Sequence, residues 1–169
     1  MAVELIKPNL ADIPFIMATE RVPGYEHLVG RSDEGWHYAA LSDARFAYFV
    51  ARMAGEPIGF VILRDWASPE QVTHIKRVAV ARPGEGLGKP FLKAIVCAVF
   101  TQTKAYRLSL GLFPDNLRAR RAYESVGFQP EGVSRGSVFF NGVNRDELVM
   151  SILRPEWAQK QAADERAVT

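Results

Sequence analysis

The sequence predicts a single α/β domain with a mixed central sheet of about seven strands and helices on both faces. Its 169 residues, 48% of them hydrophobic, suit one compact domain with its own core. Segments typical of strands and helices follow one another in the order β-α-α-β-β-β-α-β-α-β-β, without a repeat or a linker-like tract. We therefore expect one domain over residues 1–155, followed by a polar tail over residues 156–169 that should fray.

The chain opens with a strand and two helices. The segment Val3–Lys7, which is rich in aliphatic residues, reads as a short strand. Asn9 or Asp12 can cap a first helix that ends near Glu20. Ser32 can cap a second helix, because the acidic residues that follow it suit the positive end of a helix dipole.

Two hairpins are predicted, one before and one after the middle of the chain. Residues 46–53 and 57–63 read as strands around a Gly55-Glu56 turn, and Asn141-Gly142 is a strong signal for the second hairpin. The remaining predicted elements are strands at 71–80, 106–112, 133–140 and 143–152, and helices at 91–101 and 116–126. Pro90 has no N–H and is tolerated only in a first helical turn, so the first of these helices should begin near Gly88.

The run from Val78 to Lys89, VAVARPGEGLGK, joins a strand to a helix through three alternate glycines. Gly84, Gly86 and Gly88 let bare backbone approach a ligand and let several N–H groups point in one direction. The following helix adds its unpaired N-terminal N–H groups and the positive end of its dipole. Together these features predict a phosphate-binding site.

Two common phosphate-binding motifs do not fit this run. A Walker A loop needs a first glycine where Pro83 stands, and a hydroxyl residue where Pro90 stands. A dinucleotide-binding motif needs a third glycine three positions after the second, which neither register of the alternate glycines supplies.

A second pattern lies in the predicted helix of residues 116–126. Asn116, Ala119 and Tyr123 are spaced to share one helix face, and Gly127 follows the helix where a glycine C-cap is expected. A tyrosine on a buried helix face must find a partner for its hydroxyl.

With these two motifs, the chain resembles the GNAT superfamily of N-acetyltransferases over roughly residues 45–153. The glycine run resembles that family's acetyl-coenzyme A loop, Gln/Arg-x-x-Gly-x-Gly/Ala after a Val-x-Val strand. The segment from Asn116 to Phe128 resembles its second motif. The loop departs from the pattern, since Pro83 occupies the Gln/Arg position and Arg82 stands one place early.

The resemblance implies the acetyltransferase fold, and acetyl-CoA as co-substrate, without a metal. It implies an acetyl transfer from the thioester to a primary amine, with Tyr123 as general acid to the coenzyme A thiolate. The cofactor-binding residues implied by the resemblance are Val78, Ala79, Val80, Arg82, Gly84, Glu85, Gly86, Leu87, Gly88, Lys89, Asn116 and Tyr123.

The general base is not defined by a motif. An alkyl ammonium with a pKa near ~10.4 must lose a proton before it can attack, so a carboxylate, a histidine or an ordered water is needed. Glu70 and His74 lie at or within the strand that enters the loop, and Asp65 is another candidate. We take Glu70 as the predicted base.

The acceptor amine is left open by the sequence. By resemblance, the region that varies with the acceptor contains Tyr25, Glu26, His27, Trp36 and Tyr38. A protein N-terminus, a lysine, a polyamine, an amino sugar or an antibiotic would all meet the chemical requirement.

Composition narrows the partners. A net charge of +2 with dispersed basic residues, apart from the arginines of residues 118–121, offers no basic stripe for nucleic acid. The arginines of this run can form a solvated helix face, or one of them can contact a phosphate of coenzyme A. The single cysteine, Cys97, fits core packing. We find no secretory signal and no bilayer-spanning apolar run, and expect a cytoplasmic protein.

Two alternatives to an acetyltransferase remain at this point. A non-catalytic acyl-CoA sensor on the same fold would explain the altered loop, although a sensor has no need of Tyr123. A nucleotide-dependent enzyme rests on Gly88-Lys89 alone. The oligomeric state is open, with the final hairpin as a dimer surface by analogy with the family.

Overall fold

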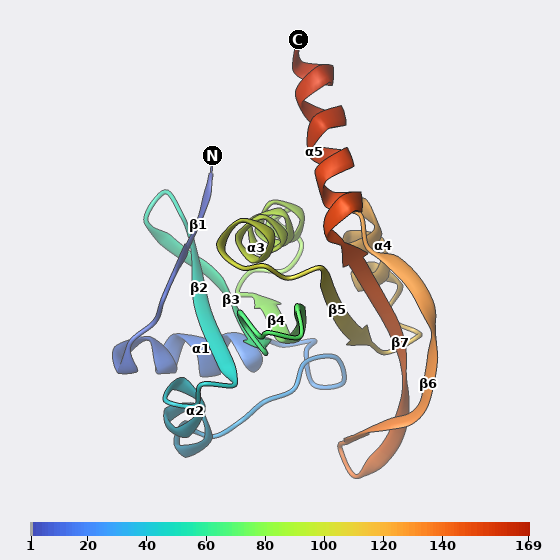
Figure 1. Cartoon of the computed structure of the whole chain (residues 1–169). Coiled ribbons are helices and arrows are strands. Elements are labelled where there is room, and N and C mark those ends of the chain that lie inside the picture. The colour runs from blue at the N-terminus through green and yellow to red at the C-terminus, as the bar shows by residue number, and fades with distance from the viewer. Residues whose placement is uncertain (1) are drawn as a thin grey trace.

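A seven-stranded mixed sheet runs through the molecule in the order β1-β2-β3-β4-β5-β7-β6 (Figure 1). The computed structural model describes residues 2–169. Neighbouring strands are antiparallel except β4 and β5, which are parallel. The strands are β1 Val3–Ile6, β2 Phe46–Met53, β3 Glu56–Arg64, β4 Val72–Val80, β5 Arg107–Leu112, β6 Gln129–Phe140 and β7 Val143–Leu153. The helices are η1 Leu10–Asp12, α1 Ile13–Glu20, α2 Glu34–Leu41, α3 Gly88–Gln102, α4 Leu117–Ser125 and α5 Arg154–Val168.

Helices cover both faces of the sheet, so the predicted fold class is confirmed. The alternation of β3 shows how the two layers form: Val61 and Leu63 pack in a large cluster with α3, whereas Phe60 and Ile62 pack in a smaller one with α1 and α2. All four side chains are fully buried. Because both faces of the central strands are covered, these strands read as nearly continuous apolar runs.

Helix α2 begins one residue later than expected. Its N-cap is Asp33, whose carboxylate accepts a hydrogen bond from the Trp36 backbone N–H at 2.8 Å. Ser32 was the predicted cap, but its hydroxyl accepts a hydrogen bond from Arg77 of β4 at 3.1 Å. A tertiary contact therefore competes successfully with a local cap.

Helix α3 begins at Gly88, as the position of Pro90 in its first turn predicts. The residue before it, Leu87, gives no side-chain cap. The first amides of α3 are therefore left for another acceptor.

The tail beyond residue 155 is helical, which corrects the expectation of frayed backbone. Glu156 caps α5 by accepting a hydrogen bond from the Leu153 backbone N–H at 2.8 Å, and Pro155 suits a first turn. Trp157 packs on Phe100 of α3 with ring centroids 5.4 Å apart. The rest of α5 extends away from the sheet (Figure 1), and among its residues only Trp157 joins the core. The boundary between domain and tail stays a prediction.

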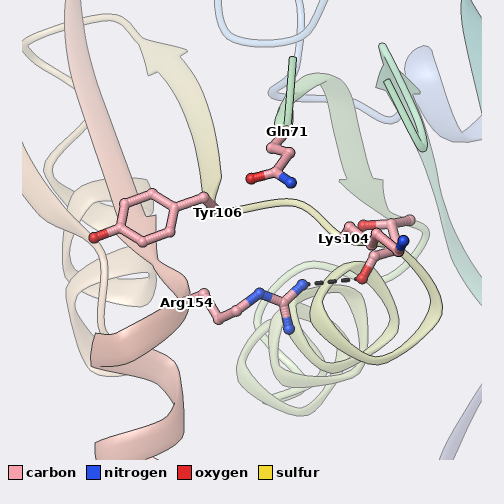
Figure 2. A pocket seen from close by; sticks show the side chains of 5 residues that line it. Gln71, Lys104, Tyr106 and Arg154 are labelled. Carbon is pink, nitrogen blue, oxygen red and sulfur yellow. Dashed lines mark hydrogen bonds between the residues drawn. The ribbon is translucent and has the colours of Figure 1, made fainter. Parts of the chain in front are cut away.

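Arg154 fastens the carboxyl end of α3 to the sheet (Figure 2). Its guanidinium donates to the carbonyl oxygens of Phe100, Thr103 and Ala105 at 2.7, 2.9 and 2.8 Å. The surface pocket beside it is also lined by Gln71 and Tyr106, at the opposite end of β4 from the glycine run. Because each of the three guanidinium nitrogens donates to a carbonyl at the end of α3 or in the turn that follows it, Arg154 acts as a structural clamp in this pocket.

No helix among residues 2–169 is long and apolar enough to cross a membrane.

Candidate active site

The sheet opens between β4 and β5. These strands pair only from Val72 to Ile75, opposite Arg107 to Leu110. Beyond that point β4 continues to Val80 with β3 as its only partner strand, while β5 continues beside β7. One edge of β4 is therefore free of strand partners over its last residues, and it leads directly into the glycine run. We call this gap the opening.

The backbone of two predicted cofactor residues faces the opening. Ala81 donates its N–H to Ile58 of β3 at 2.8 Å, so it points away from the gap. Since backbone groups alternate along a strand, those of Val80 and Val78 point into the opening and those of Ala79 toward β3. Ala79 also buries its side chain against α1 and α2. The structure thus offers Val78 and Val80, but not Ala79, for backbone pairing.

The glycine run forms a turn that presents bare backbone. Gly84 and Gly86 have positive φ angles of 89° and 74°, a conformation that strains other residues. A Cβ at Gly86 or Gly88 would meet no protein atom within 4 Å, so the space above both residues is open. Leu87 packs toward the core, whereas Lys89 is exposed.

Arg82 and Glu85 pair with each other across this turn. Arg82 Nε donates to Glu85 Oε2 at 2.8 Å, and both side chains are about half exposed. The pair braces the loop, and an exposed pair of this kind contributes little to stability. The two predicted cofactor residues are therefore brought together, but in this structure Arg82 serves Glu85.

A second arginine approaches the loop from α4. Arg118 Nη2 lies 3.9 Å from the position that a Cβ would take at Gly84. The Arg118 cation also opposes the effect of burial, which raises the pKa of Tyr25. Arg118 thus lies between the glycine run and the segment between α1 and α2, where an anionic ligand of the loop could meet it.

Helix α4 carries the two other predicted residues. Asn116 is its N-cap and accepts a hydrogen bond from the Ala119 N–H at 3.2 Å. This use of the side-chain carbonyl leaves the side-chain NH₂ without an acceptor among residues 2–169. Gly127 ends the helix with a positive φ, as predicted.

Tyr123 packs its ring while keeping its hydroxyl unpaired. The ring packs on the core beside Phe128, with centroids 5.7 Å apart in a T-shaped arrangement. Its hydroxyl has no hydrogen-bond partner within residues 2–169. Burial raises the pKa of Tyr123 to about 12, so the phenol keeps its proton throughout the neutral range.

The segment between α1 and α2 crosses from the sheet to the final hairpin. Tyr25 donates its hydroxyl to the carbonyl of Val80 at 2.8 Å, at the open edge of β4. Asn141 donates to the Glu26 carbonyl at 2.9 Å, and Arg145 donates to the His27 carbonyl at 3.0 Å. This loop, residues 21–33, therefore closes one side of the opening. Three of the five residues expected to vary with the acceptor lie on it.

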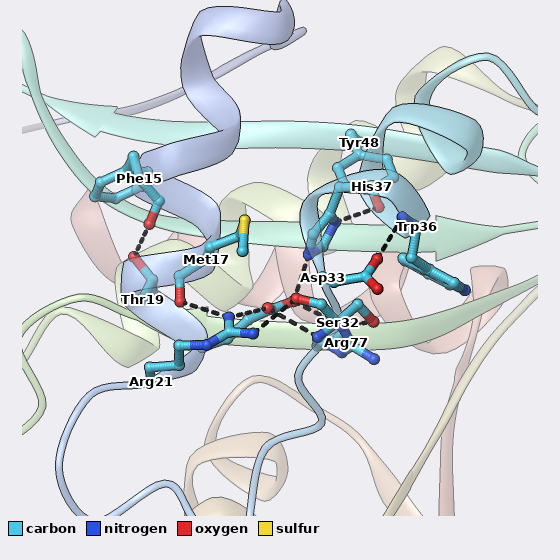
Figure 3. A network of polar contacts seen from close by, with 11 residues as sticks. Phe15, Met17, Thr19, Arg21, Ser32, Asp33, Trp36, His37, Tyr48 and Arg77 are labelled. Atoms are coloured by element: carbon cyan, nitrogen blue, oxygen red, sulfur yellow. Dashed lines mark hydrogen bonds and ion pairs between the residues drawn. The ribbon is translucent and has the colours of Figure 1, made fainter.

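A buried polar network holds the far end of this loop (Figure 3). Arg77 Nη1 lies 2.6 Å from Glu20 Oε1, and Glu20 Oε2 accepts the Ser32 N–H at 3.2 Å. His37 Nε2 lies 3.0 Å from the same carboxylate but is poorly aligned for a hydrogen bond, and its Nδ1 contacts the Tyr48 hydroxyl at 2.8 Å. Burial alone would raise the pKa of Glu20, but His37 and Arg77 lower it below its ordinary value.

Sequence reasoning missed this network. The sequence marked Glu20 only as the end of a helix, and its side chain is fully buried. Its partners come from α2, the loop and β4, so no local pattern could have marked it. Trp36, by contrast, lies beside Arg77, with the guanidinium 5.5 Å from its ring, and Tyr38 is exposed and bonds to Glu34.

The structure does not bring the predicted base to the opening. Glu70 is exposed in the turn before β4, where β4 and β5 are about to pair. Asp65 is exposed at the end of β3. His74 lies within the paired part of β4, and its Nδ1 contacts Ser109 Oγ at 3.0 Å. Burial, then the cations of Arg64, Lys76 and Arg107, lower the pKa of His74 to about 4, which makes it a weak base.

Comparison with known families identifies the fold's relatives. The model of the acetyltransferase (GNAT) family matches residues 13–128, more than half of the chain. The chain belongs to this family. The matched range contains β2 to β5, the glycine run and α4, so it includes every element around the opening except the final hairpin.

Similar proteins are named as N-acetyltransferases. A probable N-acetyltransferase, YjcK of Bacillus subtilis, is 36% identical over 76 residues, which is 45% of this chain and 42% of the relative. The aminoglycoside N(6')-acetyltransferase type 1 of Klebsiella pneumoniae is 29% identical over 106 residues, 56% of this chain and 53% of the relative. The chain thus matches about half the length of these relatives.

The structural likeness extends over nearly the whole chain. The spermidine N-acetyltransferase of Vibrio cholerae, crystallised with CoA and spermine, superposes with a TM-score of 0.80 at 20% identity. The match covers 92% of this chain and 98% of that protein. At this sequence identity the structural likeness shows that the chain has the acetyltransferase fold, and it carries no argument about function.

The low pKa of His74 makes stability depend on pH. The unfolded chain binds a proton at His74 near the ordinary value of 6.5, whereas the folded chain binds it only near 4. Stability from the neutral ring is therefore present above pH 6.5 and is lost as pH falls toward 4. We expect the wild type to lose about 2 kcal/mol more than His74→Asn between pH 7 and pH 5. Urea denaturation at both pH values measures this; equal losses would contradict the shift.

Proposed function

We propose that this chain is an acetyl-CoA-dependent N-acetyltransferase, which moves an acetyl group directly from the thioester to a primary amine. The observation that carries the proposal is the opening itself. A free strand edge runs from Val78 to Val80 into a glycine turn, at the uncapped start of a 15-residue helix. Membership of the family and the unpaired Tyr123 hydroxyl support a reaction there rather than binding alone.

The residues present fit acetyl-CoA. The backbone of Val78 and the N–H of Val80, whose carbonyl accepts the Tyr25 hydroxyl, can pair with the amide groups of its pantetheine arm as an added strand would. The pyrophosphate fits the amides of the glycine turn and the start of α3, where no side chain stands in the way at Gly86 or Gly88. Arg118 lies close enough to add a cation. We propose that the free NH₂ of Asn116 donates to the pantetheine.

The chemistry divides between an electrophile and a proton donor. Acetyl-CoA supplies an activated carbonyl and a thiolate leaving group. Tyr123 holds a proton that the departing thiolate can take, and its pKa of about 12 keeps that proton in place at neutral pH. The N–H dipoles of the loop are fixed by the fold, so they need little reorganisation during the reaction.

The acceptor is a primary amine in this proposal. Relatives are named for aminoglycosides and for spermine and spermidine, all of which carry several amines. The loop of residues 21–33 and the hairpin shape the side from which an acceptor would enter. A homodimer through that hairpin stays a prediction, for which the exposed Phe139 and Val143 are the reason.

The alternative is a non-catalytic acyl-CoA sensor. The Arg82–Glu85 pair supports this alternative. Arg82 is next to Pro83, which stands where the family has Gln or Arg, and its side chain is already paired with Glu85. A screen for thiol release from acetyl-CoA, with polyamines, aminoglycosides, lysine and peptide amines as acceptors, separates the two. We expect release with at least one amine class. Thermal stabilisation by acetyl-CoA without release from any class would support the sensor.

Gly88→Ala tests the cofactor site without disturbing the fold. Gly88 has no positive φ and no protein atom near its Cβ, and alanine favours a helix. We expect unchanged thermal stability and coenzyme A affinity about tenfold weaker by calorimetry, because the methyl group stands where the phosphates must approach. Gly35→Ala is the matched control, since it too is a first-turn glycine with room for a methyl group. Equal affinities would show that the phosphates bind elsewhere.

Tyr123→Phe tests the general acid. The ring and its packing on Phe128 remain, so stability and coenzyme A affinity should change little, while kcat falls ~10²–10⁴-fold. The raised pKa adds a second expectation. An acid with a pKa of about 12 remains protonated at pH 10, so wild-type turnover should not decline between pH 9 and 10 through loss of this proton. A half-fall near ~10 would indicate a phenol with an ordinary pKa.

A further inference from the structure

Glu147 of β7 lies on the face of the sheet opposite α3 and α4. Its neighbours Leu148, Met150 and Ile152 alternate with it and belong to the core cluster under those helices. Glu147 therefore points to the side covered by α1, α2 and the loop of residues 21–33. This side is the one from which an acceptor can reach the opening if coenzyme A lies between α3 and α4.

The Glu147 carboxylate sits over the point where the sheet divides. A Cβ built on Gly111 would lie 2.9 Å from Glu147 Cδ and closer still to Oε2. Gly111 is the first residue of β5 beyond its pairing with β4. The missing side chain at Gly111 thus makes room for this carboxylate at the apex of the opening.

One carboxylate oxygen of Glu147 has no protein partner. Oε1 accepts the Ser137 hydroxyl at 2.9 Å, whereas Oε2 accepts no hydrogen bond from residues 2–169. Ser137 reaches it because β6 bulges between Ser134 and Val138, opposite this part of β7. A bulge that aims a side chain in this way is typical of functional positions.

The neighbouring carboxylates are already occupied. Glu131 pairs with Arg107 and also accepts the Ser151 hydroxyl; Asp146 accepts the Gly136 N–H at 2.8 Å; and Asp115 lies 3.5 Å from Arg145. Arg145 shares the face of Glu147 but is directed to His27 and Phe113. Glu147 is half-buried and has no cation within ion-pair distance in the described chain.

We propose that Glu147 receives the ammonium group of the acceptor, an inference that rests on the proposed acetyltransferase function. Oε2 pairs with the cation, and then takes one proton from it. The freed nitrogen lone pair forms the C–N bond to the acetyl carbon, and the nitrogen then releases its second proton to solvent. The C–S bond breaks, and the thiolate takes the proton of Tyr123. The products are the N-acetyl amine and coenzyme A, with Glu147 protonated and Tyr123 deprotonated until solvent restores both.

Glu147→Gln is the test variant, and Asp146→Asn is its matched control. Both remove one negative charge from adjacent residues of β7, and only the first removes it from the apex. Calorimetry on the coenzyme A-saturated protein uses spermine and paromomycin as probes. We expect at least one of them to bind the wild type and to bind Glu147→Gln about tenfold more weakly, with Asp146→Asn unchanged. In the transfer assay kcat should fall ~10²-fold in Glu147→Gln, beyond any change in KM.

Gly111→Ala tests the position rather than the charge. The added methyl group can be accommodated only if the flexible Glu147 carboxylate moves away from the apex. Gly111 has no positive φ, so alanine does not strain the backbone there. We expect a folded protein with normal coenzyme A affinity, weaker amine binding and slower transfer. Loss of amine binding with folding intact would support the site even if the Gln variant were unstable.

The outcomes separate this inference from the proposed function. Normal transfer and amine binding in Glu147→Gln would overturn the inference while leaving the enzyme an acetyltransferase. A slow Glu70→Gln beside a normal Glu147→Gln would return the base to Glu70 and overturn it too. Amine binding that depends on Glu147, in a protein that releases no thiol, would support the ammonium site and count against the proposed reaction. Failure of both probes to bind the wild type would overturn the inference.

Discussion

The short pairing of β4 with β5 is the constraint on which the rest of the molecule depends. Parallel strands need a crossover, and α3 supplies it; yet the two strands remain together for only four residue pairs. Beyond them β4 keeps one edge free, which a soluble sheet normally has to cover. Here the free edge leads into a glycine turn and an uncapped helix start, so three sets of backbone groups without strand or helix partners lie around one gap.

The acceptor side of the opening is held by buried charge. Glu20 is fully buried, and removing a carboxylate from water costs several kcal/mol unless partners compensate. Arg77 and His37 provide that compensation, and Ser32 is drawn into the same group. A buried pair of this kind is weak evidence for extra stability. Its visible effect is geometric, since it fixes where the loop leaves α1 and enters α2.

The sequence predicted the elements better than it predicted the contacts between them. Strand alternation, the Pro90 position and Gly127 are local signals, and each gave the right element. Local signals failed where a distant residue intervened: Ser32 lost its capping role to Arg77, and Ala79 turned its backbone toward β3.

The candidate site shows the same division. The glycine run and Tyr123 were visible as motifs. Glu147 was not, because its importance comes from the β5–β7 register that sets it over Gly111, and from a bulge on β6. The loop it faces is fixed at Ser32 by the charge network and near its middle by Asn141 and Arg145. Between these anchors Leu28 and Arg31 are exposed, and Val29 packs at the margin of the smaller core cluster. The sequence of such a segment can change during evolution without disturbing the cofactor site. Proteins descended from one ancestor could therefore come to accept different amines while they keep the same thioester chemistry.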